Sequence, residues 1–192
     1  MGKAGGPHIL TVFAHPAPEL SPVHRAMLDI AREHVCEVRD LYELYPDFVI
    51  DVEAEQAALA APDLVVLQYP MHWFTPPALM VEWLDAVFLR GFAYGADGGR
   101  LRDRTLLVAL TTGARARDFE DGGLNRYSMA EFLRPLEQMS RRCGLRWAEP
   151  FIVHDTTLSL DKSLERGAER WRARLEAVAA DARTRRRKLA VS

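Results

Sequence analysis

Short uncharged runs of aliphatic and β-branched residues recur along the chain, separated by longer amphipathic stretches. The most apolar run is Leu-Val-Val-Leu at residues 64–67, inside a strand predicted at 63–69. Further strands are predicted at residues 8–14, 35–41, 105–111 and 145–153. The last is weaker because Pro150 interrupts it. Continuous apolar runs of this length are typical of strands that are buried on both faces of a parallel sheet.

Between these strands, apolar positions recur at helical spacing. The helix predicted at residues 21–34 has Ser21 as a suitable N-cap and Pro22 at its first position. Further helices are predicted at residues 52–60, 76–90, 128–143 and 161 to about 184, and a loop at 42–51.

Strands and helices therefore alternate along the chain. This alternation predicts an α/β fold with helices on both faces of an open parallel sheet. Among five-stranded doubly wound folds we expect the flavodoxin-like strand order 2-1-3-4-5. Ligands of such sheets bind at the carboxyl ends of the strands, so the chemistry should lie in the loops after strands one, three and four.

Composition fits one domain at residues 1–192, with a core at about 8–182 and a basic tail at 183–192. The net charge of −2 argues against a nucleic-acid partner. The basic tail has two interpretations. It is either a solvated, frayed end or an electrostatic hold on a membrane surface or an acidic partner.

Several features predict a cytoplasmic protein. Cys36 and Cys143 lack a metal-binding or redox spacing, so we expect buried free thiols. Residues 64–81 carry no formal charge, but prolines interrupt them, which favours a strand and a turn over a membrane span. The residues ahead of the first strand contain no apolar segment of the kind found in signal peptides.

The three expected ligand loops each contain candidate residues. In the first, Ser21 opens a helix whose free amides suit a phosphate, although an ordinary capped helix would look the same. The second carries Trp73 and Phe74, which suit a flat aromatic ligand or a core or interface anchor equally well. The third, at residues 111–114, has small residues that allow a close backbone approach.

Other site classes lack their motifs. No G-x-G-x-x-G or Walker lysine supports a dinucleotide Rossmann site or a P-loop, and no G-x-S-x-G supports a serine hydrolase. No H-E-x-x-H or paired Cys/His spacing predicts a metal site.

The loops and some intervening segments together resemble a known family. The matching segments are A-H-P at 14–16 with Ser21, L-Y-P-D-F at 44–48, D-V-E-A-E-Q at 51–56, Y-P-M-H-W-F at 69–74, G-F-A-Y-G at 91–95 and T-T-G at 111–113. In this order they resemble the flavodoxin-like NAD(P)H dehydrogenase (quinone) family. The resemblance is greatest to its bacterial branch, the ancillary quinone reductases of glutathione-gated potassium-efflux systems.

The resemblance implies a flavin site on the three loops. The flavin phosphate would be held by His15, Ser21, Val23 and His24. The ring would be lined by Pro70, Met71, His72, Trp73 and Phe74. Its pyrimidine end would be bound by Thr111, Thr112, Gly113 and Ala114, and Phe119 is also expected to contact the cofactor.

The resemblance further implies a homodimer with its active sites at the interface, where Tyr94 would close the neighbouring pocket. Trp73 and Asn125 complete the expected catalytic group. FMN is the expected flavin with FAD as the alternative, NADH or NADPH is the donor, and a quinone is the acceptor. A potassium-efflux antiporter is the implied partner, which would place the protein at the periphery of the inner membrane.

The chain departs from the family pattern at three positions. His24 replaces an Asn, Ala114 replaces a second Gly, and Asn125 stands where many relatives carry a His. Because an Asn supplies no proton near neutral pH, we expect flavin binding with slow quinone turnover.

Two other functions stay open at this point. One is a regulatory module that docks on an antiporter with secondary reductase activity. The other is a flavodoxin-type electron carrier, which the near-neutral charge disfavours.

Overall fold

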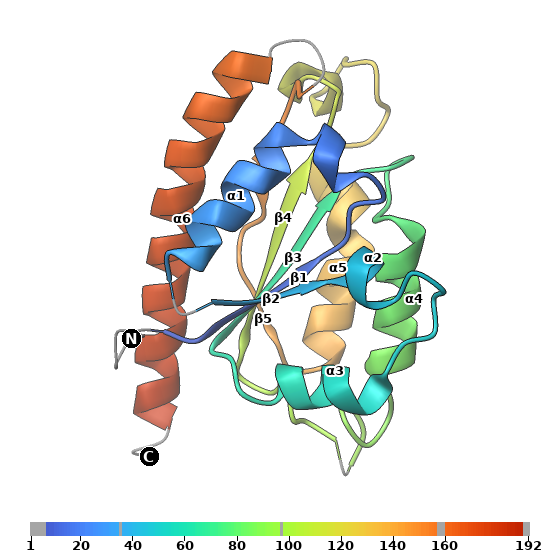
Figure 1. Cartoon of the computed structure of the whole chain (residues 1–192), viewed down its shortest axis with the longest axis vertical. Helices are drawn as coiled ribbons and strands as arrows, with labels where there is room; N and C mark the ends of the chain where they lie inside the picture. The colour runs from blue at the N-terminus through green and yellow to red at the C-terminus, as the bar shows by residue number, and fades with distance from the viewer. Residues whose placement is uncertain (1–6, 35, 97, 157–159, 190–192) are drawn as a thin grey trace.

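The computed structural model describes residues 7–34, 36–96, 98–156 and 160–189. Its centre is a parallel sheet with the order β2-β1-β3-β4-β5, in which β6 also pairs with β4 (Figure 1). The strands are β1 (Ile9–Phe13), β2 (Cys36–Asp40), β3 (Leu64–Pro70), β4 (Thr105–Thr111), β5 (Arg146–Trp147) and β6 (Phe151–Val153). The predicted flavodoxin-like order 2-1-3-4-5 is confirmed.

The predicted fifth strand at 145–153 is split into two short segments. Both run along β4, with Arg146 opposite Thr105 in the first segment and Phe151 opposite Ala109 in the second. The break falls at Pro150, which has no N–H group to donate to a neighbouring strand. The strand therefore exists in the expected place, but it is interrupted at the proline.

Helices cover both faces of the sheet (Figure 1). One face carries α1 (Pro22–Arg32) and α6 (Leu160–Leu189), and the other carries α4 (Ala78–Val87) and α5 (Met129–Arg142). Shorter elements are α2 (Leu41–Leu44), which lies in the predicted loop, α3 (Val52–Leu59), and the 3₁₀ turns η1 (Pro18–Leu20) and η2 (Ala116–Phe119).

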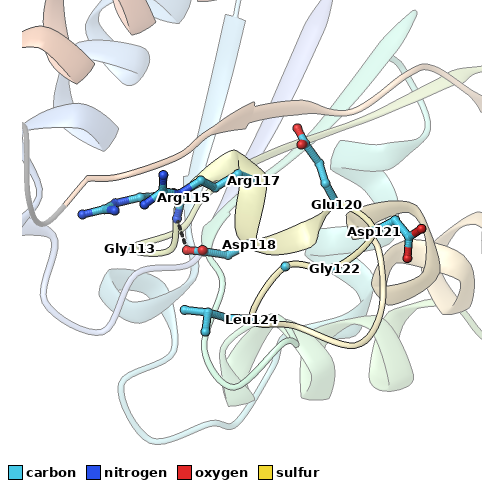
Figure 2. Close-up of a pocket in the computed structure, with 9 residues that line it drawn as sticks. Gly113, Arg115, Arg117, Asp118, Glu120, Asp121, Gly122 and Leu124 are labelled. Atoms are coloured by element: carbon cyan, nitrogen blue, oxygen red, sulfur yellow. Dashed lines mark hydrogen bonds between the residues drawn. The ribbon is translucent and has the colours of Figure 1, made fainter.

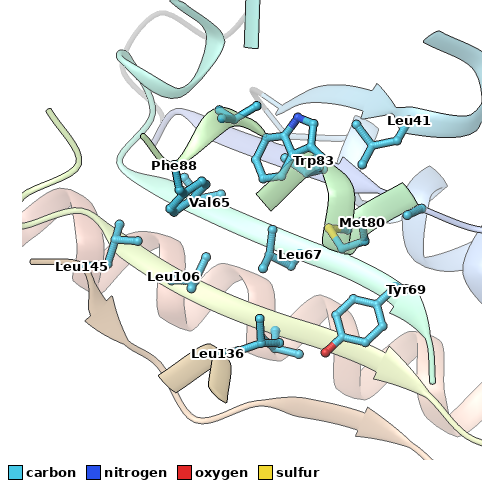
Figure 3. Close-up of a cluster of buried hydrophobic side chains, with 14 of the residues drawn as sticks. Leu41, Val65, Leu67, Tyr69, Met80, Trp83, Phe88, Leu106, Leu136 and Leu145 are labelled. Atoms are coloured by element: carbon cyan, nitrogen blue, oxygen red, sulfur yellow. The ribbon is translucent and has the colours of Figure 1, made fainter. Parts of the chain in front are cut away.

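Side chains of the central strands alternate between two hydrophobic clusters. Val65 and Leu67 face the α4–α5 side together with Trp83, as Figure 3 shows. Leu64 and Val66 face α1 and α6 instead. Successive residues of a strand point to opposite faces, so continuous apolar runs supply both clusters at once.

The basic end of the chain differs from the predicted tail. Helix α6 was expected to end at about Thr184 but continues to Leu189. Arg186 donates to Asp63 Oδ1 at 3.0 Å and to the Ala61 carbonyl at 2.6 Å. The reading of residues 183–189 as a frayed tail was therefore wrong, because a side chain in this segment is tied to the loop before β3; residues 190–192 lie outside the described part.

The uncharged run at residues 64–81 forms β3, a turn and the first residues of α4. Within the described residues, none of the helices combines the length and the apolar character needed to cross a bilayer.

The buried carboxylate of Glu55 connects β2, α3 and α4 through hydrogen bonds. Glu55 of α3 is fully buried and accepts hydrogen bonds from Tyr45 Oη at 2.5 Å and Arg39 Nε at 2.9 Å on one oxygen. Its other oxygen accepts from Trp83 Nε1 of α4 at 2.9 Å. One charged group thus satisfies all three partners, and its loss would leave two buried donors unpaired and Arg39 with only the more exposed Glu37 at 3.5 Å.

We predict that Glu55→Ala lowers the free energy of unfolding by about 3–5 kcal/mol, because it leaves the buried Tyr45 and Trp83 donors unpaired and removes the buried partner of Arg39. Glu53→Ala removes an exposed carboxylate from the same helix and should change it by about 0.5 kcal/mol or less. Urea unfolding of both variants measures the difference, and equal effects would contradict the role of Glu55.

Candidate functional site

The loops after β1, β3 and β4 meet at the carboxyl edge of the sheet and enclose a cleft of about 270 Å³. The register of the strands places Pro70 opposite Thr111, so the residues that follow each strand begin side by side. The Met71 amide donates to the Thr111 carbonyl at 2.8 Å and continues the pairing one step beyond the strands.

Most of the predicted cofactor-binding residues line this cleft. They are His15, Ser21, Val23, Pro70, Met71, His72, Thr111, Thr112 and Gly113. His24, Trp73, Phe74, Ala114 and Phe119 do not line it, nor do Tyr94 and Asn125.

At one end of the cleft, Ser21 caps α1. Its hydroxyl accepts from the His24 amide at 3.4 Å, and Pro22 occupies the first helical position. The Val23 amide follows in the first turn, where helix amides have no carbonyl partner within the helix. His15 lies beside this helix start, and its Nδ1 accepts the Ala17 amide at 3.1 Å. Burial lowers the pKa of His15, and the nearby His72 adds to this effect, so this end offers neutral donors and a helix terminus.

His24 stands behind the cleft wall. Its imidazole is fully buried, with Nε2 3.0 Å from Thr111 Oγ1 and Nδ1 3.2 Å from Gln68 Nε2. The same Gln68 amide nitrogen is 3.2 Å from the His24 carbonyl, which fixes it as a donor. Nδ1 of the neutral ring therefore accepts, and Nε2–H donates to Thr111. This leaves the hydroxyl proton of Thr111 available to a ligand in the cleft.

The segment after β3 forms a tight hairpin. His72 and Thr75 exchange backbone hydrogen bonds at 2.9 and 3.0 Å, and the residues between them, Trp73 and Phe74, have φ of 46° and 66°. Positive φ at both central positions is typical of a type I′ turn, which favours Asn and Gly. Trp73 is 91% exposed. Large side chains in this conformation are strained, and such strain concentrates at functional sites.

Phe74 packs against α5, whereas Trp73 is exposed to solvent. Its ring stacks on Phe132 of α5, with centroids 4.6 Å apart and an interplanar angle of 16°. The hairpin is thereby held against α5 while the indole of Trp73 stays in solvent. The amides of Trp73 and Phe74 have no hydrogen-bond partner within the described residues, which leaves them available to a ligand.

The loop after β4 offers one free amide. Thr112 N–H donates to the Val153 carbonyl at 2.9 Å, and Ala114 N–H donates to Thr112 Oγ1 at 3.2 Å. The Gly113 amide between them has no partner among the described residues. Ala114 is not among the residues with positive φ, and it packs against the α4–α5 cluster. Its methyl group is thus accommodated without backbone strain.

The remaining predicted residues lie elsewhere. Phe119 is buried against His154, with ring centroids 5.6 Å apart. Asn125 is half-buried, and its backbone amide donates to the Asp118 carbonyl at 2.8 Å. Tyr94 belongs to the connection from α4 to β4, which lies at the opposite edge of the sheet from the cleft (Figure 1). It therefore does not reach the cleft of its own chain.

Three lining residues were missed by the sequence analysis: Leu20, Pro22 and Thr156. Thr156 follows β6, and its hydroxyl donates to the Thr112 carbonyl at 3.3 Å. The loop after the fifth strand opens on the same carboxyl edge as the other three, so the strand order alone indicated it.

Burial lowers the pKa of His24 to about 3, with a smaller effect from the charge of His15. Between pH 6.5 and 3 the unfolded state binds a proton that the folded state excludes, so stability falls as pH falls. We predict that wild-type protein loses about 1.4 kcal/mol per pH unit more than His24→Asn in this range.

Thr111→Val is the matched control, since it breaks the same hydrogen bond but keeps the imidazole. It should retain the wild-type pH slope in urea unfolding measured from pH 7 to 4. An unchanged slope in His24→Asn would refute a neutral, buried imidazole.

Comparisons with known proteins bear on this cleft. A family model described as a flavodoxin-like fold matches residues 7–175. The glutathione-regulated potassium-efflux system ancillary protein KefF of Klebsiella aerogenes is 42% identical over 168 residues, which are 87% of this chain and 94% of the relative.

Solved structures share the fold. General stress protein 14 from Treponema denticola, in complex with FMN, has a TM-score of 0.84 and 37% identity over 90% of this chain and 99% of its own. A structure named thermophilic tryptophan halogenase from Streptomycin violaceusniger has a TM-score of 0.82 and 36% identity over 88% and 97%. An NADPH-quinone reductase from P. pentosaceus, at 22% identity over 86% and 95% with a TM-score of 0.78, supports the fold alone.

The names of these relatives describe different activities. The similarity therefore identifies the family but not the reaction, which has to be inferred from the residues of the cleft. The family model and the identity to KefF both extend over most of the chain. The chain belongs to the flavodoxin-like fold family and is a relative of KefF.

Proposed function

We propose that the protein is a flavin-dependent NAD(P)H:quinone oxidoreductase that binds FMN. The observation that carries this proposal is the cleft at the carboxyl edge, where a helix start, the first residues of a strained aromatic hairpin (His72 and the two before it) and a free glycine amide converge. A phosphate, a flat ring and a polar ring edge are the three parts of FMN, and each has a matching wall here.

The groups that line the cleft match the chemical parts of FMN. Ser21 and the first turn of α1 would hold the phosphate, since helix-terminal amides and a hydroxyl favour an anion. The Trp73–Phe74 hairpin would lie along the ring, and Gly113 would donate to its pyrimidine end. When bound, the flavin supplies two-electron hydride chemistry between the nicotinamide and the quinone.

The residues that line the cleft would stabilise negative charge on the flavin ring. Amide donors such as Gly113 and the Thr111 hydroxyl favour negative charge on the ring, since oriented dipoles stabilise charge that develops during reaction. Asn125 does not line the cleft of its own chain, and an Asn supplies no proton, so slow turnover is expected. FMN bound to a relative of 37% identity supports FMN over FAD.

We further propose a homodimer in which Tyr94 of one chain closes the cleft of the other. Exposed apolar side chains support an interface, since Trp73, Leu124 and Tyr127 are 91%, 90% and 50% exposed. Light scattering of the purified protein tests this, and a monomer at micromolar concentration would refute it.

A second function is supported by the name of the relative at 42% identity, an ancillary protein of a potassium-efflux system. We propose that this chain docks on such an antiporter at the membrane periphery. A colourless protein that still raises antiporter activity in vesicles would favour docking as the primary role, whereas a yellow protein that oxidises NAD(P)H with a quinone would favour the enzyme.

The direct test is an absorption spectrum of the purified protein, followed by identification of the released flavin. We expect bound FMN and quinone-dependent oxidation of NAD(P)H. Protein that neither carries nor takes up flavin would refute the oxidoreductase.

We predict that Trp73→Asn stabilises the fold and weakens flavin binding. Asn tolerates the positive φ, and the exposed indole has few contacts to lose, so relief of about 1 kcal/mol of strain should raise Tm by about 2–4 °C. Loss of a stacking ring should weaken flavin binding by about tenfold.

Phe48→Asn is the control, because Phe48 also has a positive φ of 64° but lies between α2 and α3, outside the loops that enclose the cleft. It should leave flavin affinity at the wild-type value. Thermal melts and fluorescence titration with FMN measure both quantities. Lower Tm together with unchanged affinity in Trp73→Asn would contradict a strained, functional hairpin.

A further inference from the structure

A second cavity adjoins the flavin cleft. It has a volume of about 740 Å³ and is formed by the segment from Gly113 through η2 to Leu124. Gly113 lines both this cavity and the cleft, so the two spaces meet at one residue. A molecule that reaches the flavin ring over Gly113 can therefore extend into the second cavity.

Two arginines form one end of this cavity. Arg115 and Arg117 are exposed, and Figure 2 shows their side chains projecting in the same direction, on the side of Gly113. Neither guanidinium has an ion-pair partner within the described residues, whereas Arg39, Arg172 and Arg185 each have one. Both guanidiniums are thus available to an anionic ligand.

The carboxylates of the same segment do not neutralise this pair. Glu120 and Asp121 point away from the arginines in Figure 2. Asp118 instead accepts the backbone amide of Arg115 at 2.9 Å. Two of the three carboxylates are therefore apart from the arginines, and the third, Asp118, offsets part of their charge without forming an ion pair with them.

Backbone hydrogen bonds within residues 118–125 hold the turn that carries the arginines. Asn125 N–H donates to the Asp118 carbonyl at 2.8 Å, and Gly123 N–H donates to the Glu120 carbonyl at 2.9 Å. A Cβ at position 123 would overlap the backbone of Arg117 and Asp118, so only glycine fits there. Phe119 anchors the turn in the core. The arginines are thus placed by a built turn before any ligand arrives.

We propose that Arg115 and Arg117 bind the 2′-phosphate of NADPH and make the protein selective for NADPH over NADH. The inference rests on the proposed function, since it requires the nicotinamide to reach the flavin over Gly113. A phosphomonoester carries nearly two negative charges at neutral pH, and two unpaired guanidiniums match its charge and its acceptor oxygens. NADH lacks this group and gains nothing from the pair.

The test compares the full-length, flavin-loaded protein with an R115Q/R117Q variant. The charge-matched control is R187Q/K188Q, which removes two exposed charges near the end of α6, at the other end of the molecule from the cleft (Figure 1). Calorimetry with 2′,5′-ADP and with 5′-AMP isolates the 2′-phosphate, since the two probes differ only by that group. Steady-state assays with a benzoquinone then give KM for NADPH and for NADH.

We expect wild-type and control proteins to bind 2′,5′-ADP about tenfold or more tightly than 5′-AMP, and R115Q/R117Q to lose this preference. KM for NADPH should rise about tenfold in that variant, with NADH changed by less than about twofold. Equal binding of the two probes by wild type, or equal losses with both donors, would overturn the proposal.

Failure of the inference and failure of the proposed function are separate results. Quinone reduction driven equally well by NADH and NADPH would reject NADPH selectivity and leave the oxidoreductase in place. Absence of flavin and of any NAD(P)H oxidation would reject the oxidoreductase whatever the calorimetry shows.

Discussion

The pairing of β3 with β4 is the constraint on which the cleft depends. Both strands are buried on both faces, and their register runs from Leu64 opposite Thr105 to Pro70 opposite Thr111. A slip of one residue in this register would turn the side chains of the slipped strand to the opposite face of the sheet. Residues that now pack in one hydrophobic cluster would then face the other cluster. The same register brings Met71 to the Thr111 carbonyl. Burial of apolar side chains therefore fixes the position of the polar loops that follow.

Five of the six segments that carry the family resemblance fall into two physical groups. Those at 14–21, 69–74 and 111–113 contain residues that line the cleft. Those at 44–48 and 51–56 contribute Tyr45 and Glu55, which form a buried network with Arg39 and Trp83. The second group binds no ligand in this cleft, yet it fixes α3 against α4. A shared motif thus indicates a shared fold as often as a shared site.

The sequence predicted the sheet because continuous apolar runs have one simple explanation, and it placed the site because the carboxyl edge follows from strand order. What it missed depends on tertiary contacts. The weakening of the fifth strand at Pro150 was expected from the sequence, but Arg186 holds a helix end that composition alone made a tail. The burial of His24 and the common direction of Arg115 and Arg117 arise from packing and chain reversal, which no local pattern encodes.

The charges around the cleft follow a consistent arrangement. Its inner wall is polar, and the two histidines at the helix start have lowered pKa values because burial disfavours their charged forms. Arg115 and Arg117, which have no ion-pair partner among the described residues, lie beyond Gly113 in the adjoining cavity. An anion at Ser21 would be held by amides and a helix terminus at short range, where salt screens little, whereas exposed arginines act through a field that salt weakens. If both proposals hold, the architecture would separate a group held by fixed dipoles at Ser21 from one that binds and dissociates at exposed arginines.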